Sequence, residues 1–387
     1  MLEYIRAKVV DYAIILSWIE QELQDIELRR PEHHSLIVRL QSELAETKDL
    51  HNYLIELVKA DDGSVLSLIP VFESFIVLAT SYYLPALQKE GEADRFLRQL
   101  LLAAMKQCGL NWIEDIVVQL DGQHATFSRL SAETPLILAP PQHAVSFLDM
   151  PGLYHEFGHN VSRKLPRIVD ILTVAVSEHF ADLLRNADSL ISKIRDERNL
   201  AINNALEYWN IERQNELFCD IFATFVCGPA HYISCIDMAL RSDRDSFHVD
   251  DEDVHPPFSA RVYACYKSLN LIYSHEPIVV MAQNAWKGYE DMQRRNGEFD
   301  LICSETLLDC LVGTAIRCIR ELLPGAKYYS TPLPCDEELE HIPEEMSLAD
   351  ILNRGAKILF TYPERYADWE KKTFKKIKSL YRLDLNI

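Results

Sequence analysis

The 387-residue sequence has few basic residues for its number of acidic ones. Lysine and arginine together number 39, whereas aspartate and glutamate number 59, and the formal net charge at pH 7 is −20. A surface with this charge repels phosphate backbones and anionic membranes. We therefore expect no nucleic acid and no membrane among the partners.

Long apolar runs and paired-cysteine motifs are also missing from the sequence. The apolar run at 13–19 is short and lies among charged residues, which is atypical of a signal peptide or a membrane span. The nine cysteines are odd in number, lack CxxC spacing and mostly lie in apolar helical patterns. We interpret them as reduced thiols and, with no secretory signal predicted, expect a soluble, cytoplasmic protein.

Two histidines and a glutamate stand together in the segment 155–159, which reads HEFGH. In a helix, His155 and His159 share a face, because residues four apart are neighbours on the helix surface. Both imidazoles can then reach one Zn²⁺ ion, with Glu156 beside its bound water. The alternative interpretation is a pair of histidines on a helix surface that binds no metal.

Residues on both sides of this motif predict where its helix begins and ends. Asp149 can cap the N-terminus, and Pro151 suits the first turn because its missing N–H is not needed there. Pro166 stops the helix soon after the second histidine. The motif is therefore predicted to lie on a helix, as zinc binding requires.

A third metal ligand is expected downstream, because catalytic zinc usually takes three protein ligands and leaves one position to water. Glu216 and Asp220 lie one turn apart in the apolar segment 215–223, where carboxylates are costly to bury without a cation or a hydrogen-bond donor. We predict that Glu216 binds the metal and that Asp220 holds a ligand histidine. Glu178, with Asp182 one turn further, is the alternative on spacing.

The HExGH segment and the later NExxxDxxA segment resemble the gluzincin branch of zinc metallopeptidases, the thermolysin-like and CAAX-prenyl-endopeptidase-like families. The resemblance covers residues 153–261 at most. It implies His155, His159 and Glu216 as zinc ligands, Glu156 as general base and Asp220 as a supporting partner. The Asn before Glu216 favours it over Glu178, and the missing GxxH after HEFGH disfavours the metzincin branch.

A further element, HPPFSAR at 255–261, is similar to the HPxxxxR element of the CAAX-type relatives. The resemblance implies that His255 donates to the oxyanion formed when water adds to the substrate carbonyl. A His-Pro-Pro that only shapes the start of a helix is an equal alternative, and Tyr154 or Tyr232 could serve as the donor. Prenylated substrates are not expected, because no membrane span is predicted.

The predicted fold is α+β and predominantly helical, with a zincin-like metallopeptidase core and a small antiparallel sheet before the HEFGH helix. β-prone runs at 116–120, 125–130 and 135–139 predict the strands, and Asp-Gly at 121–122 predicts a hairpin. The sheet either packs against the helix or pairs with an extended substrate. The predicted parts are an N-terminal helical region (1–110), the core (111–323), and a linker with C-terminal helices (324–387).

The sequence as a whole predicts a zinc-dependent metallopeptidase in which Glu156 takes a proton from the zinc-activated water. Its partner would be a peptide or protein substrate. Two alternatives remain at this point: a zinc hydrolase that acts on a non-peptide amide or ester, and a catalytically silent zinc-binding regulatory protein. Endo- or exopeptidase mode and oligomeric state are left open.

Overall fold

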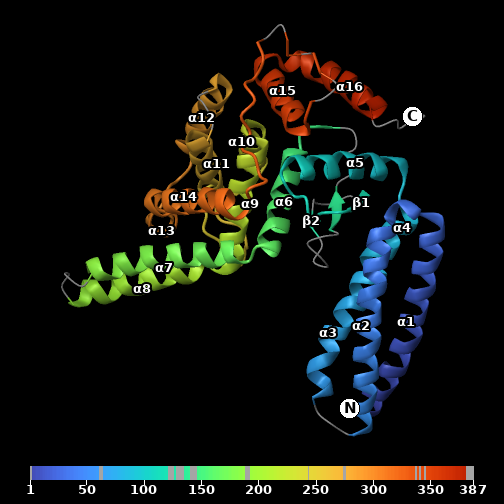
Figure 1. Ribbon diagram of the computed structural model, residues 1–387. Coiled ribbons are helices and arrows are strands. Elements are labelled where there is room, and N and C mark those ends of the chain that lie inside the picture. The colour runs from blue at the N-terminus through green and yellow to red at the C-terminus, as the bar shows by residue number, and fades with distance from the viewer. Residues whose placement is uncertain are drawn as a thin grey trace. The chain divides into compact units, whose positions relative to one another are not determined.

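The structure, a computed structural model, describes residues 2–60, 64–120, 126–127, 135–139, 146–187, 192–242, 244–272, 276–335, 338–339, 341–343 and 346–380. These residues are predominantly helical, with one small sheet (Figure 1). The chain divides into two compact units, Met1–Leu102 with Trp112–Pro140, and Ala103–Asn111 with Pro141–Ile387. This division differs from the three predicted parts, because the strands belong with the N-terminal helices and the C-terminal helices belong with the HEFGH helix.

The first unit consists of helices that share one apolar core. Its elements are α1 (Leu2–Arg29), η1 (Pro31–His33), α2 (His34–Lys59), α3 (Val65–Leu78), η2 (Ala79–Tyr83), α4 (Leu84–Lys89) and most of α5 (Glu92–Gln107). Ile19, Leu23 and Ile26 of α1 are buried at helical spacing against Leu40 of α2 and Phe72 of α3. The π-helical turn η2 precedes Pro85, which has no N–H to continue regular helix bonding.

The sheet of this unit is mixed, and the predicted antiparallel sheet is wrong in this respect. Its strands are β1 (Val117–Leu120), β2 (Thr126–Phe127) and β3 (Leu136–Ala139), in the order β1-β3-β2. β1 pairs with β3 in parallel, and β2 pairs with β3 antiparallel. Leu136 and Ile137 are fully buried, which suits the central position of β3, so β1 and β2 are not hairpin partners. The predicted turn at 121–122 lies outside the described residues.

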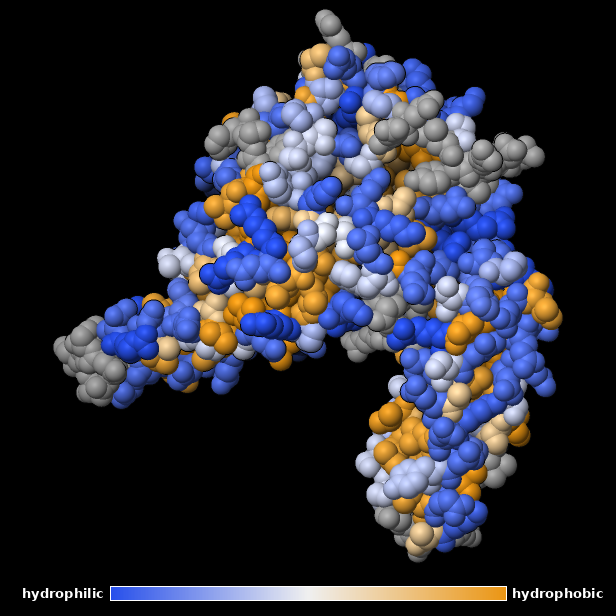
Figure 2. Space-filling model, viewed as in Figure 1, coloured by the Kyte–Doolittle hydropathy of each residue, from blue (hydrophilic) through white to orange (hydrophobic). Residues whose placement is uncertain are grey.

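The helices of the first unit also expose large apolar side chains, visible as orange patches in Figure 2. Val71 and Val77 on α3 are among them, with exposed fractions of 59% and 50%. The continuous helical segment Ser67–Lys89 is long and apolar enough to cross a membrane by length and composition alone. Core helices of water-soluble proteins meet the same criterion, so this segment assigns no location.

The second unit contains the HEFGH helix, and its described residues form helices joined by loops. Its helices are α6 (Pro151–Lys164), α7 (Arg167–Ala187), α8 (Ser192–Tyr208), α9 (Ile211–Cys227), α10 (Pro229–Arg241), α11 (Phe258–Ile272), α12 (Pro277–Glu290), α13 (Gly297–Ile302), α14 (Glu305–Leu322), α15 (Leu348–Thr361) and α16 (Pro363–Leu380). α9 lies at the centre, packed against α6, α10, α11 and α14 (Figure 1). Its residues from Leu217 to Cys227 are all buried, which explains their almost uninterrupted apolar sequence.

The ends of the helices around the site agree only in part with the ends predicted from the sequence. Pro151 begins α6 as predicted, but Met150 occupies the capping position and the Asp149 carboxylate instead accepts from Arg241 at 2.8 Å. Residues 201–226 have a helical apolar pattern that predicts one helix, but the structure divides them between α8 and α9. Asn210 causes this break, because its side chain accepts from the backbone N–H of Arg213 and caps α9.

Candidate metal centre

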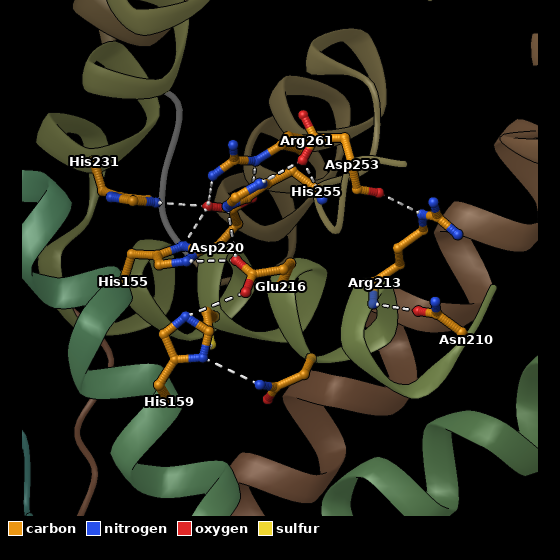
Figure 3. A network of polar contacts seen from close by, with 12 residues as sticks. His155, His159, Asn210, Arg213, Glu216, Asp220, His231, Asp253, His255 and Arg261 are labelled. Carbon is orange, nitrogen blue, oxygen red and sulfur yellow. Dashed lines mark hydrogen bonds and ion pairs between the residues drawn. The ribbon is translucent and has the colours of Figure 1, made fainter. Parts of the chain in front are cut away.

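The two histidines of α6 face one glutamate of α9. Nε2 of His155 lies 3.0 Å from Oε2 of Glu216, and Nε2 of His159 lies 3.4 Å from Oε1 (Figure 3). The two imidazole rings are 5.0 Å apart between centroids and meet edge to face. The structure therefore brings together the three predicted zinc ligands, although they are 61 residues apart in the sequence at the widest.

A glycine allows α6 and α9 to approach this closely. A methyl group on Gly158 would lie 2.7 Å from Cα of Cys219, which is shorter than a normal carbon contact of about 3.5–4.0 Å. The absence of a side chain at this position of HEFGH thus lets the backbone of α9 pass directly beside the histidines. Gly158, the fourth residue of HEFGH, therefore sets the packing of the two helices in addition to spacing the histidines.

Asp220 is placed as a partner of His155. Oδ1 of Asp220 accepts from Nδ1 of His155 at 2.8 Å, so Nε2 on the opposite side of the ring is left for a metal. Arg261 donates to both oxygens of Asp220, at 2.6 and 3.0 Å. Asp220 is fully buried, and this pairing satisfies its charge.

The second ring nitrogen of His159 faces the side chain of Asn215, with Nδ1 and Nδ2 separated by 3.1 Å. The buried Oδ1 of Asn215 has no hydrogen-bond partner among the described residues. Rotation of the amide by half a turn would let Oδ1 accept from an Nδ1–H and would leave Nε2 free for a metal. Asn215, the first residue of the NExxxD pattern, therefore contacts one of the predicted metal ligands.

Cys219 offers a different donor near the same histidine. Donor atoms of His155, His159 and Cys219 lie within 4.8 Å of one another. The thiol, however, lies 3.3 Å from Nδ1 of His159, on the ring edge that Asn215 also faces. Glu216, in contrast, faces the Nε2 atoms of both histidines, as the predicted third donor would.

His255 lies at the exposed side of this cluster. Its Nε2 is 3.3 Å from Oε2 of Glu216, and its Nδ1 is 2.9 Å from Oδ1 of Asp253. The guanidinium of Arg213 donates to three backbone carbonyl oxygens in the loop 250–253 and so fixes the chain just before His255. With 44% of its side chain exposed, His255 can meet a ligand that enters from solvent.

The other residues considered from the sequence lie elsewhere. Glu178 and Asp182 are exposed on α7, and no hydrogen bond or ion pair of the described residues joins either one to the two histidines. The Tyr154 side chain is buried in the core, and the hydroxyl of Tyr232 donates to Gln283. Among these alternatives and His255, the structure places only His255 beside the histidine and glutamate cluster.

Burial and neighbouring charges shift the pKa values of the two histidines in opposite directions. Burial disfavours the charged form of His155, but the carboxylates of Asp220 and Glu216 outweigh it and raise its pKa to about 10. Burial lowers the pKa of His159 to about 4, and the positive charge of His155 adds to the shift. Without a metal, a proton on His155 thus supplies part of the positive charge that balances the two carboxylates.

The donor set fits a divalent cation such as zinc. Two imidazole nitrogens and one carboxylate are typical of catalytic zinc, and they leave a coordination position open. A cation could replace the proton on His155 and keep the charges of Glu216 and Asp220 balanced. The partners of the outer ring nitrogens, Asp220 and Asn215, are those that such ligands need.

Comparisons with known proteins find no relative of this chain. No protein-family model matches it, and no curated protein or solved structure is significantly similar to it. The gluzincin resemblance therefore depends on the motifs, and the function has to be argued from the site itself.

Three supporting residues were not singled out by the sequence. Arg261 was noted only as the last residue of the HPxxxxR element. Nothing in the sequence indicates that Arg213 holds the loop before His255. The Nε2 atom of His231 lies 3.6 Å from Oδ1 of Asp220. The only indication of His231 in the sequence is its position four residues before Cys235, which places both side chains on one face of a helix. Each depends on contacts between segments that are distant in the sequence.

Proposed function

We propose that the protein is a zinc-dependent hydrolase of peptide bonds, with His155, His159 and Glu216 as the metal ligands. The observation that carries the proposal is the convergence of both Nε2 atoms on the two oxygens of Glu216. A structural metal site would need no general base, yet the motif supplies Glu156 next to the first ligand. Zinc bound there would polarise the substrate carbonyl and lower the pKa of a bound water.

Glu156 has the properties of a general base in this site. Burial raises its pKa to about 7, and the negative charge of Glu216 adds to the shift, against the opposing charge of His155. A divalent cation nearby would lower this pKa and favour the carboxylate. Glu156 would then accept a proton from the attacking water and deliver it to the leaving amine.

His255 would stabilise the negative charge that develops on the substrate oxygen. Its contact with Asp253 orients the ring, and its exposed position lets Nε2 exchange Glu216 for a substrate atom. A pocket of about 330 Å³ adjoins His255 and Arg261, with Arg244, Asp245 and His248 in its wall. This space beside the cluster is where a substrate side chain would bind.

The test is metal analysis of the full-length protein followed by digestion of a complex peptide library. We expect stoichiometric zinc at the cluster and cleavage that a chelator abolishes and added zinc restores. Glu156→Gln should keep the zinc and lose turnover by several orders of magnitude, because only proton transfer is removed. Glu178→Gln, an exposed glutamate on α7, is the matched control and should behave as wild type.

Two outcomes would contradict the proposal. Glu156→Gln with activity within tenfold of wild type would remove the assigned general base. A zinc-loaded protein that cleaves ester or non-peptide amide substrates but no peptide would show that the same site serves another substrate class.

A further inference from the structure

A second cluster of metal-binding residues lies next to Asp220, whose Oδ1 contacts both His155 and His231. It consists of His231 and Cys235 of α10 and Cys265 of α11, whose donor atoms lie within 4.8 Å of one another. All three residues are buried, with exposed fractions of 2%, 2% and 0%. His231 and Cys235 are four residues apart on one helix, and the third donor comes from a neighbouring helix, as in the first cluster.

The distances within this cluster match those between the ligands of one zinc ion. Two sulfurs bound to tetrahedral zinc at about 2.3 Å lie about 3.8 Å apart, and a nitrogen and a sulfur lie about 3.6 Å apart. The Sγ atoms of Cys235 and Cys265 are 3.7 Å apart, and Sγ of Cys235 is 3.4 Å from Nε2 of His231. These two donor–donor distances therefore match those around one zinc ion.

A separate contact orients His231 as a metal ligand. Its Nδ1 lies 3.1 Å from the backbone carbonyl oxygen of Pro151, which can only accept a hydrogen bond. This contact calls for a proton on Nδ1, and it leaves Nε2 facing the thiol of Cys235. A metal-binding histidine is typically held in this way, by donation from its other ring nitrogen to a carbonyl.

We propose that His231, Cys235 and Cys265 bind a second zinc ion, distinct from the one at the HEFGH helix. Two thiolates and one imidazole neutralise a divalent cation in this buried position and suit zinc better than magnesium or calcium. Oδ1 of Asp220 lies 3.6 Å from Nε2 of His231 and is a candidate for the fourth position (Figure 3). The ion would link α10 to α11 and would therefore serve as a structural metal site.

Metal stoichiometry separates this site from the proposed catalytic one. The protein is produced with zinc and freed of loosely bound metal. The amount of zinc per chain is then measured for the wild type and for three variants. We expect two equivalents in the wild type and one in both His159→Ala and Cys235→Ser. Cys303→Ser, which changes a buried thiol outside the cluster, is the control and should keep two.

X-ray absorption at the zinc edge of the His159→Ala protein provides a second readout that needs no cysteine variant. We expect two sulfur neighbours at about 2.3 Å from the remaining ion. One equivalent of zinc in the wild type, lost in His159→Ala and retained in Cys235→Ser, would overturn the inference, as would a Cys235–Cys265 disulfide in the freshly purified protein. One equivalent retained in His159→Ala and lost in Cys235→Ser would support this site and contradict the catalytic one.

Discussion

Replacement of Gly158 by alanine tests whether close contact between α6 and α9 assembles the metal site. The added methyl group would lie 2.7 Å from Cα and 3.0 Å from Cβ of Cys219. Normal carbon contacts are about 3.5–4.0 Å, so the two helices must separate by about 1 Å. This shift moves His155 and His159 away from Glu216, because the histidines belong to α6 and the glutamate to α9.

The expected size of the effect follows from two opposing terms. Alanine stabilises a helix by up to about 1 kcal/mol relative to glycine, whereas overpacking of a tight interface costs about 1–3 kcal/mol. We expect Gly158→Ala to lower the free energy of unfolding by up to about 2 kcal/mol. We also expect zinc affinity to fall by about 10–100-fold, the range found when the surroundings of metal ligands are disturbed.

The matched control is Gly152→Ala in the same helix, where an added methyl group would meet no described atom within 4 Å. This change should leave zinc affinity unaltered and should not lower stability. Urea unfolding and a zinc titration against a competing chelator measure both quantities on the full-length protein. Equal stability and equal zinc affinity in the two variants would refute the argument that Gly158 sets the distance between the helices.

Two further predictions concern residues outside the ligand set. His255→Ala should lower kcat on the order of 10²-fold with little change in zinc content, because one oxyanion donor is lost; loss of the metal would show instead that His255 is a ligand. In the first unit, His33 is buried between Glu90 and Asp115, at 3.1 and 3.2 Å. Burial opposes its charge, but these carboxylates outweigh it and raise the pKa of His33. Its stabilising contribution is therefore complete below about pH 6.5 and is lost as the pH rises through the higher folded-state pKa. The free energy of unfolding should fall over that range more steeply in the wild type than in His33→Gln, and parallel curves would contradict this.

The parts of the site that were predictable are those encoded within single helices. The i,i+4 spacing of His155 and His159 and the apolar surroundings of Glu216 are local properties, and the helices around them follow from periodicity. The meeting of these helices required one more feature, a glycine at 158. Its role as a packing residue becomes visible only when Cys219 lies beside it.

The parts that were not predictable depend on contacts between distant segments. A hairpin was predicted from Asp-Gly at 121–122, whereas the structure places the buried strand β3 between β1 and β2. The adjacent residues His33 and His34 would point to different faces of a helix, and this predicts a solvated surface position for His33. It is buried because Glu90 and Asp115, 57 and 82 residues away, receive both ring nitrogens. Arg261 is likewise explained only by its pairing with Asp220.

The most direct test of the central claim compares zinc binding by Glu216→Ala and Glu178→Ala. Glu216 faces both histidines, whereas Glu178 is exposed on α7, although sequence spacing made either one a candidate ligand. Loss of a metal-binding carboxylate should weaken binding by at least 10–100-fold. We predict that Glu216→Ala loses the zinc held at the HEFGH helix and all hydrolytic activity, and that Glu178→Ala keeps both. Loss of this zinc in Glu178→Ala with retention in Glu216→Ala would contradict the assignment of Glu216 and of its neighbour Asp220.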